Sequence, residues 1–208
     1  MVYIDLSYDI THNMRVYPGD TEVVLRQDKF LAADHYNNFN LSTGMHVGTH
    51  VDSPMHMADH PLHMGDYPVD QFCGRGIVLD VRGQSVIALT HSQVSAIQQD
   101  DMVLFYTGWE ERYGTSEYYS DHPVLAPHTA GCLIDRGVKL IGLDAPSPDH
   151  YPFDIHKRLF KHGIFIAENL RNLGLLVDKS PVELFMFPLK IRADASLIRA
   201  VARVNSQP

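Results

Sequence analysis

The distribution of apolar residues along the chain predicts more strands than helices. Residues 2–8, 22–31 and 39–47 mix apolar and polar side chains, as half-buried strands do. The continuous apolar run at 102–106 predicts a strand buried on both faces, with layers of structure on each side, and the largely apolar segment 138–143 predicts another buried strand. Further strands are expected over residues 76–81, 163–167, 183–190 and 196–203.

Three short helices interrupt this series of strands. Thr90-x-x-Gln93 is a capping-box pattern and predicts a helix that continues to about residue 98. A second helix is expected over 128–136, and a third over 155–162 with Asp154 as its cap. Residues 53–70 and 110–127 are expected to be irregular. Helices and strands do not alternate regularly, so the pattern favours one α/β or α+β domain over 1–208, with a central mixed β-sheet and flanking helices.

Composition narrows the range of partners and compartments. The formal charge of −8 argues against nucleic acid and anionic membranes, because both require a basic surface. The sequence contains no apolar run of about 18 residues and no signal-peptide pattern at its start. The two cysteines are far apart and form no CxxC pair, which is typical of a reducing compartment. We therefore expect a cytoplasmic protein.

Histidines cluster in one short stretch that has the composition of a metal site. Of the 13 histidines in the chain, His46, His50, His56, His60 and His63 fall within 18 residues. With Asp52, the first three form the pattern H-x3-H-x-D-x3-H. Imidazole and carboxylate groups are common ligands of zinc and manganese. Any single histidine is more often a surface or core residue, but the matched aspartate favours a metal site. The remaining two lie in a Pro-flanked polar loop and are not expected to act directly.

The spacing requires the backbone to bend between the first two histidines. In an extended chain His46 and His50 would lie roughly 13 Å apart, too far for ligands of one ion. A continuous helix is disfavoured by Gly48 and Pro54. We predict a strand that ends near His46, a bend at Gly48, and a loop.

Two residues from the second half of the chain are further candidates. Glu168 ends an apolar strand, where a carboxylate needs a partner such as a metal ion or, alternatively, a basic side chain. His156 lies in the first turn of a helix and can face inward or be purely structural. Three ligands on one stretch would leave a coordination position open for water or substrate, as catalytic sites do.

The motif His46-x-Gly48-Thr49-His50-x-Asp52-x-Pro54-x-His56 resembles the signature of the cyclase family of metal-dependent hydrolases. This family includes bacterial kynurenine formamidases and isatin hydrolases. The resemblance extends over most of the chain, through the segments 17–20, 101–109, 142–147 and 156–170.

The resemblance implies a role for each candidate residue. One metal ion would bind the residues His46, His50, Asp52 and Glu168, and a second would bind Asp52, His156 and Glu168. His56 would transfer protons, and Tyr17 matches an aromatic residue that packs on the substrate. The family also implies a swivelling β/β/α fold with a barrel-like core, and a homodimer or larger homo-oligomer.

These expectations combine into a functional hypothesis. We expect a hydrolase that cleaves a C–N amide bond with one or two divalent ions, zinc being favoured and manganese the alternative. N-formylkynurenine, an intermediate of tryptophan catabolism, is the substrate favoured at the family level. The alternatives are an isatin-type hydrolase of a cyclic amide or imide, a non-catalytic metal-binding module and an inactive scaffold. Such an ion would lower the pKa of bound water and polarise the scissile carbonyl.

Overall fold

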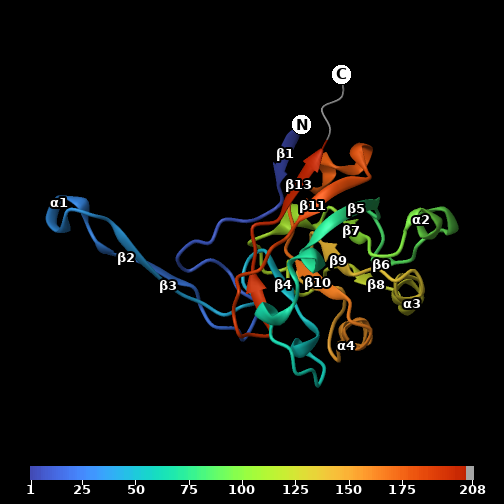
Figure 1. Cartoon of the computed structure of the whole chain (residues 1–208), viewed down its shortest axis with the longest axis horizontal. Coiled ribbons are helices and arrows are strands. Elements are labelled where there is room, and N and C mark those ends of the chain that lie inside the picture. Colours follow the sequence, from blue (N-terminus) through green and yellow to red (C-terminus); the bar gives the residue numbers. More distant parts are fainter. Residues whose placement is uncertain (205–208) are drawn as a thin grey trace.

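A curled sheet of nine strands forms the centre of the fold in a computed structural model that describes residues 1–204 (Figure 1). Residues 205–208, the end of the expected domain, lie outside this range. The strands are β1 (Val2–Asp5), β4 (His50–Asp52), β5 (Cys73–Asp80), β7 (Met102–Tyr106), β9 (Leu140–Leu143), β10 (Phe165–Glu168), β11 (Val182–Phe185), β12 (Ala195–Leu197) and β13 (Val201–Val204). Their order is β1-β13-β11-β5-β7-β9-β10-β4-β12. The four strands from β5 to β10 are parallel and the pairings outside them are antiparallel, which confirms the expected mixed sheet with barrel-like curvature.

Helices and short turns cover the sheet. Figure 1 places three helices on one side of it, namely α2 (His91–Ala96), α3 (Pro127–Asp135) and α4 (Asp154–Lys161). A small parallel pair, β6 (Val86–Ile87) and β8 (Val124–Leu125), lies near them. Single 3-10 turns are found at Pro54–His56, Met64–Asp66, Val69–Phe72, Trp109–Arg112, Leu173–Leu175 and Val177–Lys179. Within residues 1–204, no helix has both the length and the apolar composition needed to cross a bilayer.

The central strands divide their side chains between two cores. In β7, Met102 and Leu104 belong to the core inside the curl, whereas Val103 and Phe105 belong to the core beneath the helices. β5, β9 and β10 alternate in the same way. This two-sided burial explains the continuous apolar runs in these strands.

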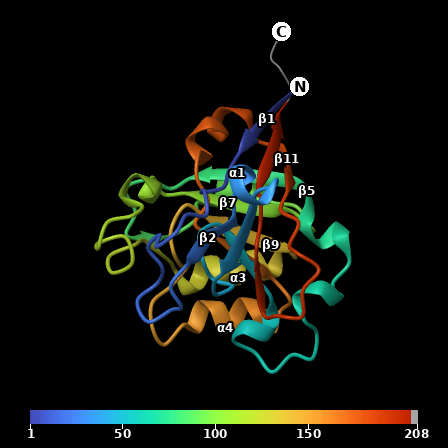
Figure 2. The same cartoon turned by 90° about the vertical axis from the view of Figure 1, so that its left-hand side faces the viewer.

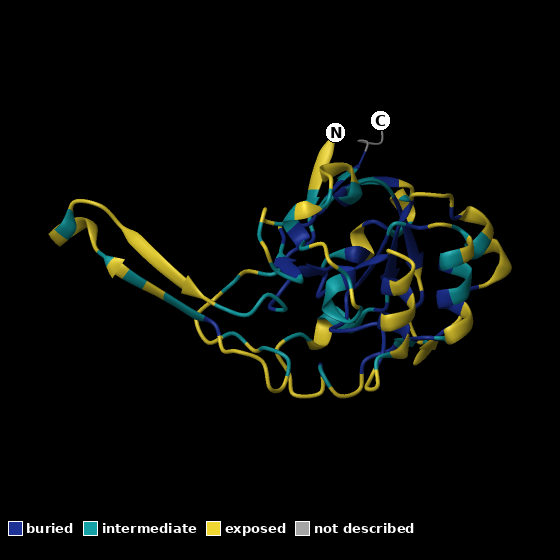
Figure 3. Cartoon of the chain, turned by 60° about the horizontal axis from the view of Figure 1, so that its bottom comes forward, coloured by how far each residue is buried: buried dark blue, intermediate teal, exposed yellow. Residues whose placement is uncertain are grey.

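A two-stranded arm projects from the body of the molecule (Figure 1), and in Figure 2 the arm lies in front of the body. It consists of β2 (Val24–Lys29) and β3 (Asn38–Ser42), with the one-turn helix α1 (Leu31–Asp34) at its tip. In Figure 3 most of the arm is coloured as exposed.

The structure corrects several details of the sequence prediction, and the strands expected over 2–8 and 183–190 end early, at Asp5 and Phe185. The strand expected over 39–47 ends at Ser42, and residues 50–52, expected in a loop, form β4. The single strand expected over 196–203 is two strands, because β12 pairs with β4 while β13 pairs with β1 and β11 at the other end of the sheet. Asp154 makes no capping hydrogen bond to α4. The amides of its first turn are bound by Asp149 instead.

Candidate active site

The predicted bend occurs at Gly48, which carries the following residues into β4. Gly48 has φ +56°, and a Cβ there would lie 2.8 Å from Ile10 Cδ1, so the position disfavours any larger residue. The carbonyl of Gly48 accepts hydrogen bonds from His50 Nδ1 and from Asn169 Nδ2. Hydrogen bonds from His50 in β4 and from Asn169, the residue after β10, therefore hold the bend in place.

Sheet pairing brings three candidate ligands to one face. His50 and Asp52 are two residues apart in β4 and therefore point to the same side. Glu168, at the end of β10, is the direct cross-strand partner of His50. All three residues are buried. Strand register therefore places the Glu168 carboxylate beside His50, although the two residues are far apart in the sequence.

The distances among these three residues fit a metal ion. His50 Nε2 lies 3.5 Å from Asp52 Oδ1 and 3.4 Å from Glu168 Oε2. Ligand atoms bound to one zinc ion at 2.0–2.2 Å are separated by roughly 3–3.5 Å. Since His50 Nδ1 donates to the Gly48 carbonyl, its Nε2 carries the free lone pair. Within residues 1–204, both His50 Nε2 and Asp52 Oδ1 are buried without a hydrogen-bond partner, although His46 Nδ1 approaches Asp52 Oδ1 to 2.9 Å.

His156 faces the opposite side of Glu168. Its Nε2 lies 3.2 Å from Glu168 Oε1, and its Nδ1 lies 2.5 Å from Asp149 Oδ1. The other oxygen of Asp149 accepts the backbone amides of Ile155 and His156. Asp149 therefore orients the ring and holds the start of α4 around it. A carboxylate on the second nitrogen is the usual support for a metal-binding histidine.

Asp194 connects His46 to His56. One oxygen, Oδ2, lies 3.0 Å from His46 Nε2 and 2.9 Å from His56 Nδ1. The two imidazole rings pack together, with centroids 4.0 Å apart. Ligand atoms of His46, Asp52 and His56 also lie within 4.8 Å of one another, so this geometry is compatible with His56 as a ligand as well as a proton carrier.

The histidines and carboxylates of this cluster favour each other's charged forms. Burial opposes ionisation of Asp52 and Glu168, but the neighbouring histidines lower the pKa of both carboxyl groups. Burial also opposes protonation of His156, yet Asp149 and Glu168 raise the pKa of its imidazole to about 9. In the same way Asp52 and Asp194 outweigh burial and raise the pKa of His46 to about 11. The buried carboxylates Asp52 and Glu168 are therefore favoured in their charged form, the form in which a carboxylate binds a cation.

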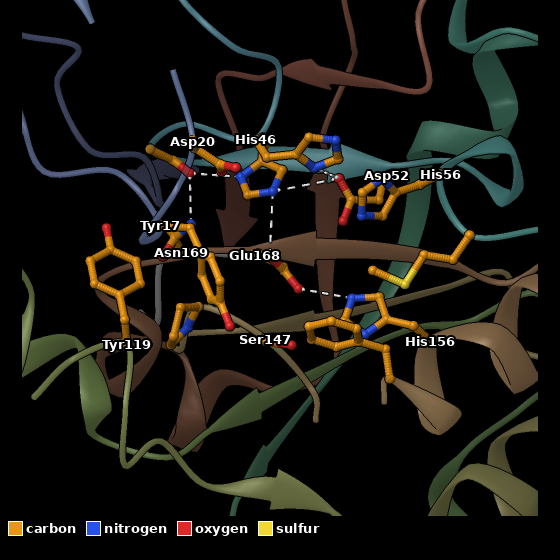
Figure 4. Close-up of a pocket in the computed structure, with 15 residues that line it drawn as sticks. Tyr17, Asp20, His46, Asp52, His56, Tyr119, Ser147, His156, Glu168 and Asn169 are labelled. Carbon is orange, nitrogen blue, oxygen red and sulfur yellow. Dashed lines mark hydrogen bonds and ion pairs between the residues drawn. The ribbon is translucent and has the colours of Figure 1, made fainter. Parts of the chain in front are cut away.

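The cluster lies at the base of a pocket with aromatic walls (Figure 4). Tyr17 and Tyr119 line it and meet edge to face, with ring centroids 5.7 Å apart. Asp20, Ser147 and Phe153 also line this pocket. The arrangement can hold a flat ring beside the acid–imidazole cluster. Tyr17 therefore lies in the wall of the pocket that holds the cluster.

All seven candidate residues line this one pocket, namely Tyr17, His46, His50, Asp52, His56, His156 and Glu168. His60 and His63 do not; His60 contacts Tyr67 and His63 contacts Asp66. Sequence reasoning missed Asp149 and Asp194. Only Asp149 had a local signal, because it lies seven residues before His156, between a buried strand and the predicted helix.

The fold and the site define a class: a curled mixed-sheet α/β protein with a buried histidine–carboxylate cluster that could hold a metal ion. The chain belongs to the cyclase family, because the family profile described as "Putative cyclase" matches residues 4–150. The chain is 34% identical to a kynurenine formamidase of Erythrobacter litoralis, over 96% of this chain and 92% of that protein. A kynurenine formamidase of Bacillus cereus is 31% identical, over 97% of both chains.

Solved structures share the fold at lower identity. Isatin hydrolase A from Labrenzia aggregata, bound to benzyl benzoate, superposes with a TM-score of 0.85. The match covers 99% of this chain and 94% of that chain at 23% identity. A structure described as a potential metal-dependent hydrolase with cyclase activity has a TM-score of 0.77 at 24% identity, over 99% of both chains. These similarities confirm the fold expected from the motif.

Proposed function

We propose that this chain is a metal-dependent amidohydrolase of the arylformamidase type, with N-formylkynurenine as its favoured substrate. The observation that carries the proposal is the position of His56, which is hydrogen bonded to Asp194, beside the buried group of His50, Asp52 and Glu168 in one aromatic-walled pocket. The two kynurenine formamidases at 31% and 34% identity support the choice of substrate.

The residues fit a divalent ion, zinc or manganese, held by His50, Asp52 and Glu168 with His46. A second ion would be held by His156 with the same two carboxylates. When bound, the metal supplies Lewis acidity toward water and the scissile carbonyl. We propose a cytoplasmic enzyme that acts as a homodimer on a small amide and requires no nucleic acid or membrane.

The chain's own residues provide binding and proton transfer. Tyr17 and Tyr119 hold the aryl ring, and the Asp20 carboxylate at the pocket offers a partner for the substrate's ammonium group. Water adds to the formyl carbon, and His56 accepts its proton while hydrogen bonded to Asp194. The C–N bond then breaks, and His56 returns the proton to the leaving nitrogen, so that the products are the aryl amine and formate.

The test is turnover of a substrate panel by metal-loaded protein. N-formyl-L-kynurenine, N-formylaniline and isatin are compared at equal concentration, with metal content measured on the same samples. We expect kcat/KM to be highest for N-formyl-L-kynurenine. Hydrolysis of isatin alone would establish the cyclic-amide alternative, and no hydrolysis by the fully loaded protein would favour the metal-binding module.

A further inference from the structure

Asn169 holds the segment around Gly48 with both its side chain and its backbone. Its Nδ2 donates to the Gly48 carbonyl over 2.9 Å, and its own carbonyl accepts from Thr49 Oγ1 over 2.6 Å. Asn169 is only 5% exposed and lines the pocket beside the candidate ligands (Figure 4). The residue that follows β10 is therefore joined twice to the segment that leads into β4.

The orientation of the Asn169 amide follows from its two partners. The Gly48 carbonyl can only accept a hydrogen bond, so the amide nitrogen must face it. The amide oxygen then faces Tyr118, whose hydroxyl donates to it over 2.8 Å. The Tyr118 side chain is fully buried, and in such a place a polar group without a partner is costly. Each partner therefore constrains the other through this one amide.

Tyr118 belongs to the loop that forms part of the aromatic wall of the pocket. Its neighbour Tyr119 lines the pocket and meets Tyr17 edge to face. The Tyr118 carbonyl accepts from Trp109 Nε1 over 2.9 Å, which holds the loop at a second point. The Asn169 amide thus connects the wall loop to the bend at Gly48.

We propose that Asn169 is a positioning residue that acts on the metal site and on the pocket wall together. On one side it fixes the Gly48 carbonyl, which accepts from His50 Nδ1 over 2.8 Å and so directs His50 Nε2 at the two carboxylates. On the other side it anchors Tyr118 and, with it, the wall loop. A group that binds the second nitrogen of a histidine sets the affinity of that histidine for metal, and Asn169 holds such a group in place.

The backbone conformation of Asn169 determines which substitutions are informative. Its φ is +55°, in the left-handed region that asparagine and aspartate adopt more readily than most residues. Asn169→Asp therefore keeps the backbone conformation and the side-chain size, but it turns an oxygen toward the Gly48 carbonyl. Asn169→Gly also fits this conformation and removes the side chain altogether.

The first test measures the zinc dissociation constant by competition with a chromophoric chelator. Asn169→Asp and Asn169→Gly should each raise the zinc Kd by about tenfold. Tyr118→Phe removes only the hydroxyl that binds the Asn169 oxygen, and it should raise the zinc Kd by about three- to fivefold. Tyr113→Phe is the matched control, because within residues 1–204 the buried Tyr113 hydroxyl has no hydrogen-bond partner, although its ring packs on Tyr118. The control should leave the zinc Kd unchanged.

A second measurement separates positioning from a purely structural role. In the zinc-loaded protein, the Nδ1 proton of His50 can be followed by NMR through its exchange with water. This exchange should be faster in Asn169→Gly and in Tyr118→Phe than in wild type, because the Gly48 carbonyl that holds the proton is less firmly fixed. It should be unchanged in Tyr113→Phe.

The effect on the pocket wall rests on the proposed function and is measured as turnover. Tyr118→Phe should raise KM for N-formyl-L-kynurenine by about two- to fivefold, because the wall loop loses one hydrogen bond. The kcat per bound zinc should stay at the wild-type value, since no group that transfers protons is changed. The same substrate assay is applied to Tyr113→Phe, for which KM should not change.

Three results would overturn the inference. They are a lower Tm with wild-type zinc affinity and wild-type exchange of the His50 proton, an equal effect of Tyr118→Phe and Tyr113→Phe, and no binding of zinc or manganese by the wild type. If the Asn169 variants do not fold, the comparison of Tyr118→Phe with Tyr113→Phe decides alone. Weakened zinc binding in a protein that hydrolyses no formamide would refute the proposed function alone, and unaltered zinc binding in an active enzyme would refute this inference alone.

Discussion

Replacing Asp194 with asparagine tests whether this carboxylate positions His56 for proton transfer. The substitution preserves side-chain size but removes the charge from the oxygen that lies 2.9 Å from His56 Nδ1 and 3.0 Å from His46 Nε2. The backbone role of Asp194 is retained, because its carbonyl still accepts from the amide and hydroxyl of Ser53. The change is therefore confined to the two imidazole contacts.

The expected loss follows from the strength of one charged hydrogen bond. Such a bond contributes about 1.5–3 kcal/mol. The side chain of Asp194 is 36% exposed, so solvent screening favours the lower end of that range. About 1.4 kcal/mol corresponds to a tenfold change in rate, and we expect kcat to fall by about tenfold. KM should change little, since Asp194 is not among the residues that line the pocket.

Steady-state kinetics with saturating metal provide the measurement. Metal content by elemental analysis must accompany it, because the contact to His46 also supports a ligand and its loss would weaken metal affinity. Asp66→Asn is the matched control, since Asp66 is also 36% exposed and also contacts a histidine, His63, away from the pocket. A fully loaded Asp194→Asn enzyme with kcat within twofold of wild type would refute the positioning role.

The remaining predictions concern the cluster and the pocket. His56→Ala should lower kcat by about 10²–10⁴ with metal retained, whereas the control His60→Ala should leave kcat unchanged. Loss of metal from His56→Ala would instead identify His56 as a ligand. Glu168→Gln should lower metal content per chain, because it removes a charge shared by both proposed positions; unchanged content would contradict this. Chelation should lower Tm by roughly 5–10 °C at a metal concentration of 100 Kd, and a scan with and without chelator checks it. Asp20→Asn should raise KM for N-formyl-L-kynurenine about three- to fivefold but leave neutral N-formylaniline unchanged; an equal effect on both would exclude an ion pair.

Much of the candidate site was predictable because its proposed ligands obey local rules. The even spacing of His50 and Asp52 places both on one face of a strand, and Gly48 supplies the bend that their spacing from His46 requires. Glu168 was identifiable as a carboxylate at the end of an apolar strand, where burial without a partner is unfavourable. The buried strands β7 and β9 were recognised from runs that are apolar on both faces.

The residues that sequence reasoning missed act through pairings between distant segments. Asp194 lies 138 residues from His56, in a polar segment whose position depends on the pairing of β12 with β4. The expected single strand over 196–203 concealed that pairing, because both halves of the segment have strand-like composition. The break falls at residues 198–200, where the chain leaves one end of the sheet for the other.

Strand register, rather than motif spacing, makes the site possible. Glu168 pairs with His50, and Leu197 pairs with His50 from the other side, so β4 lies between two strands that both determine its position. A slip of one residue in β10 would turn the Glu168 side chain to the opposite face of the sheet. The histidine–carboxylate cluster therefore depends on the whole sheet being formed. A sequence motif shows which residues are present, but it does not show that they lie close together in the fold.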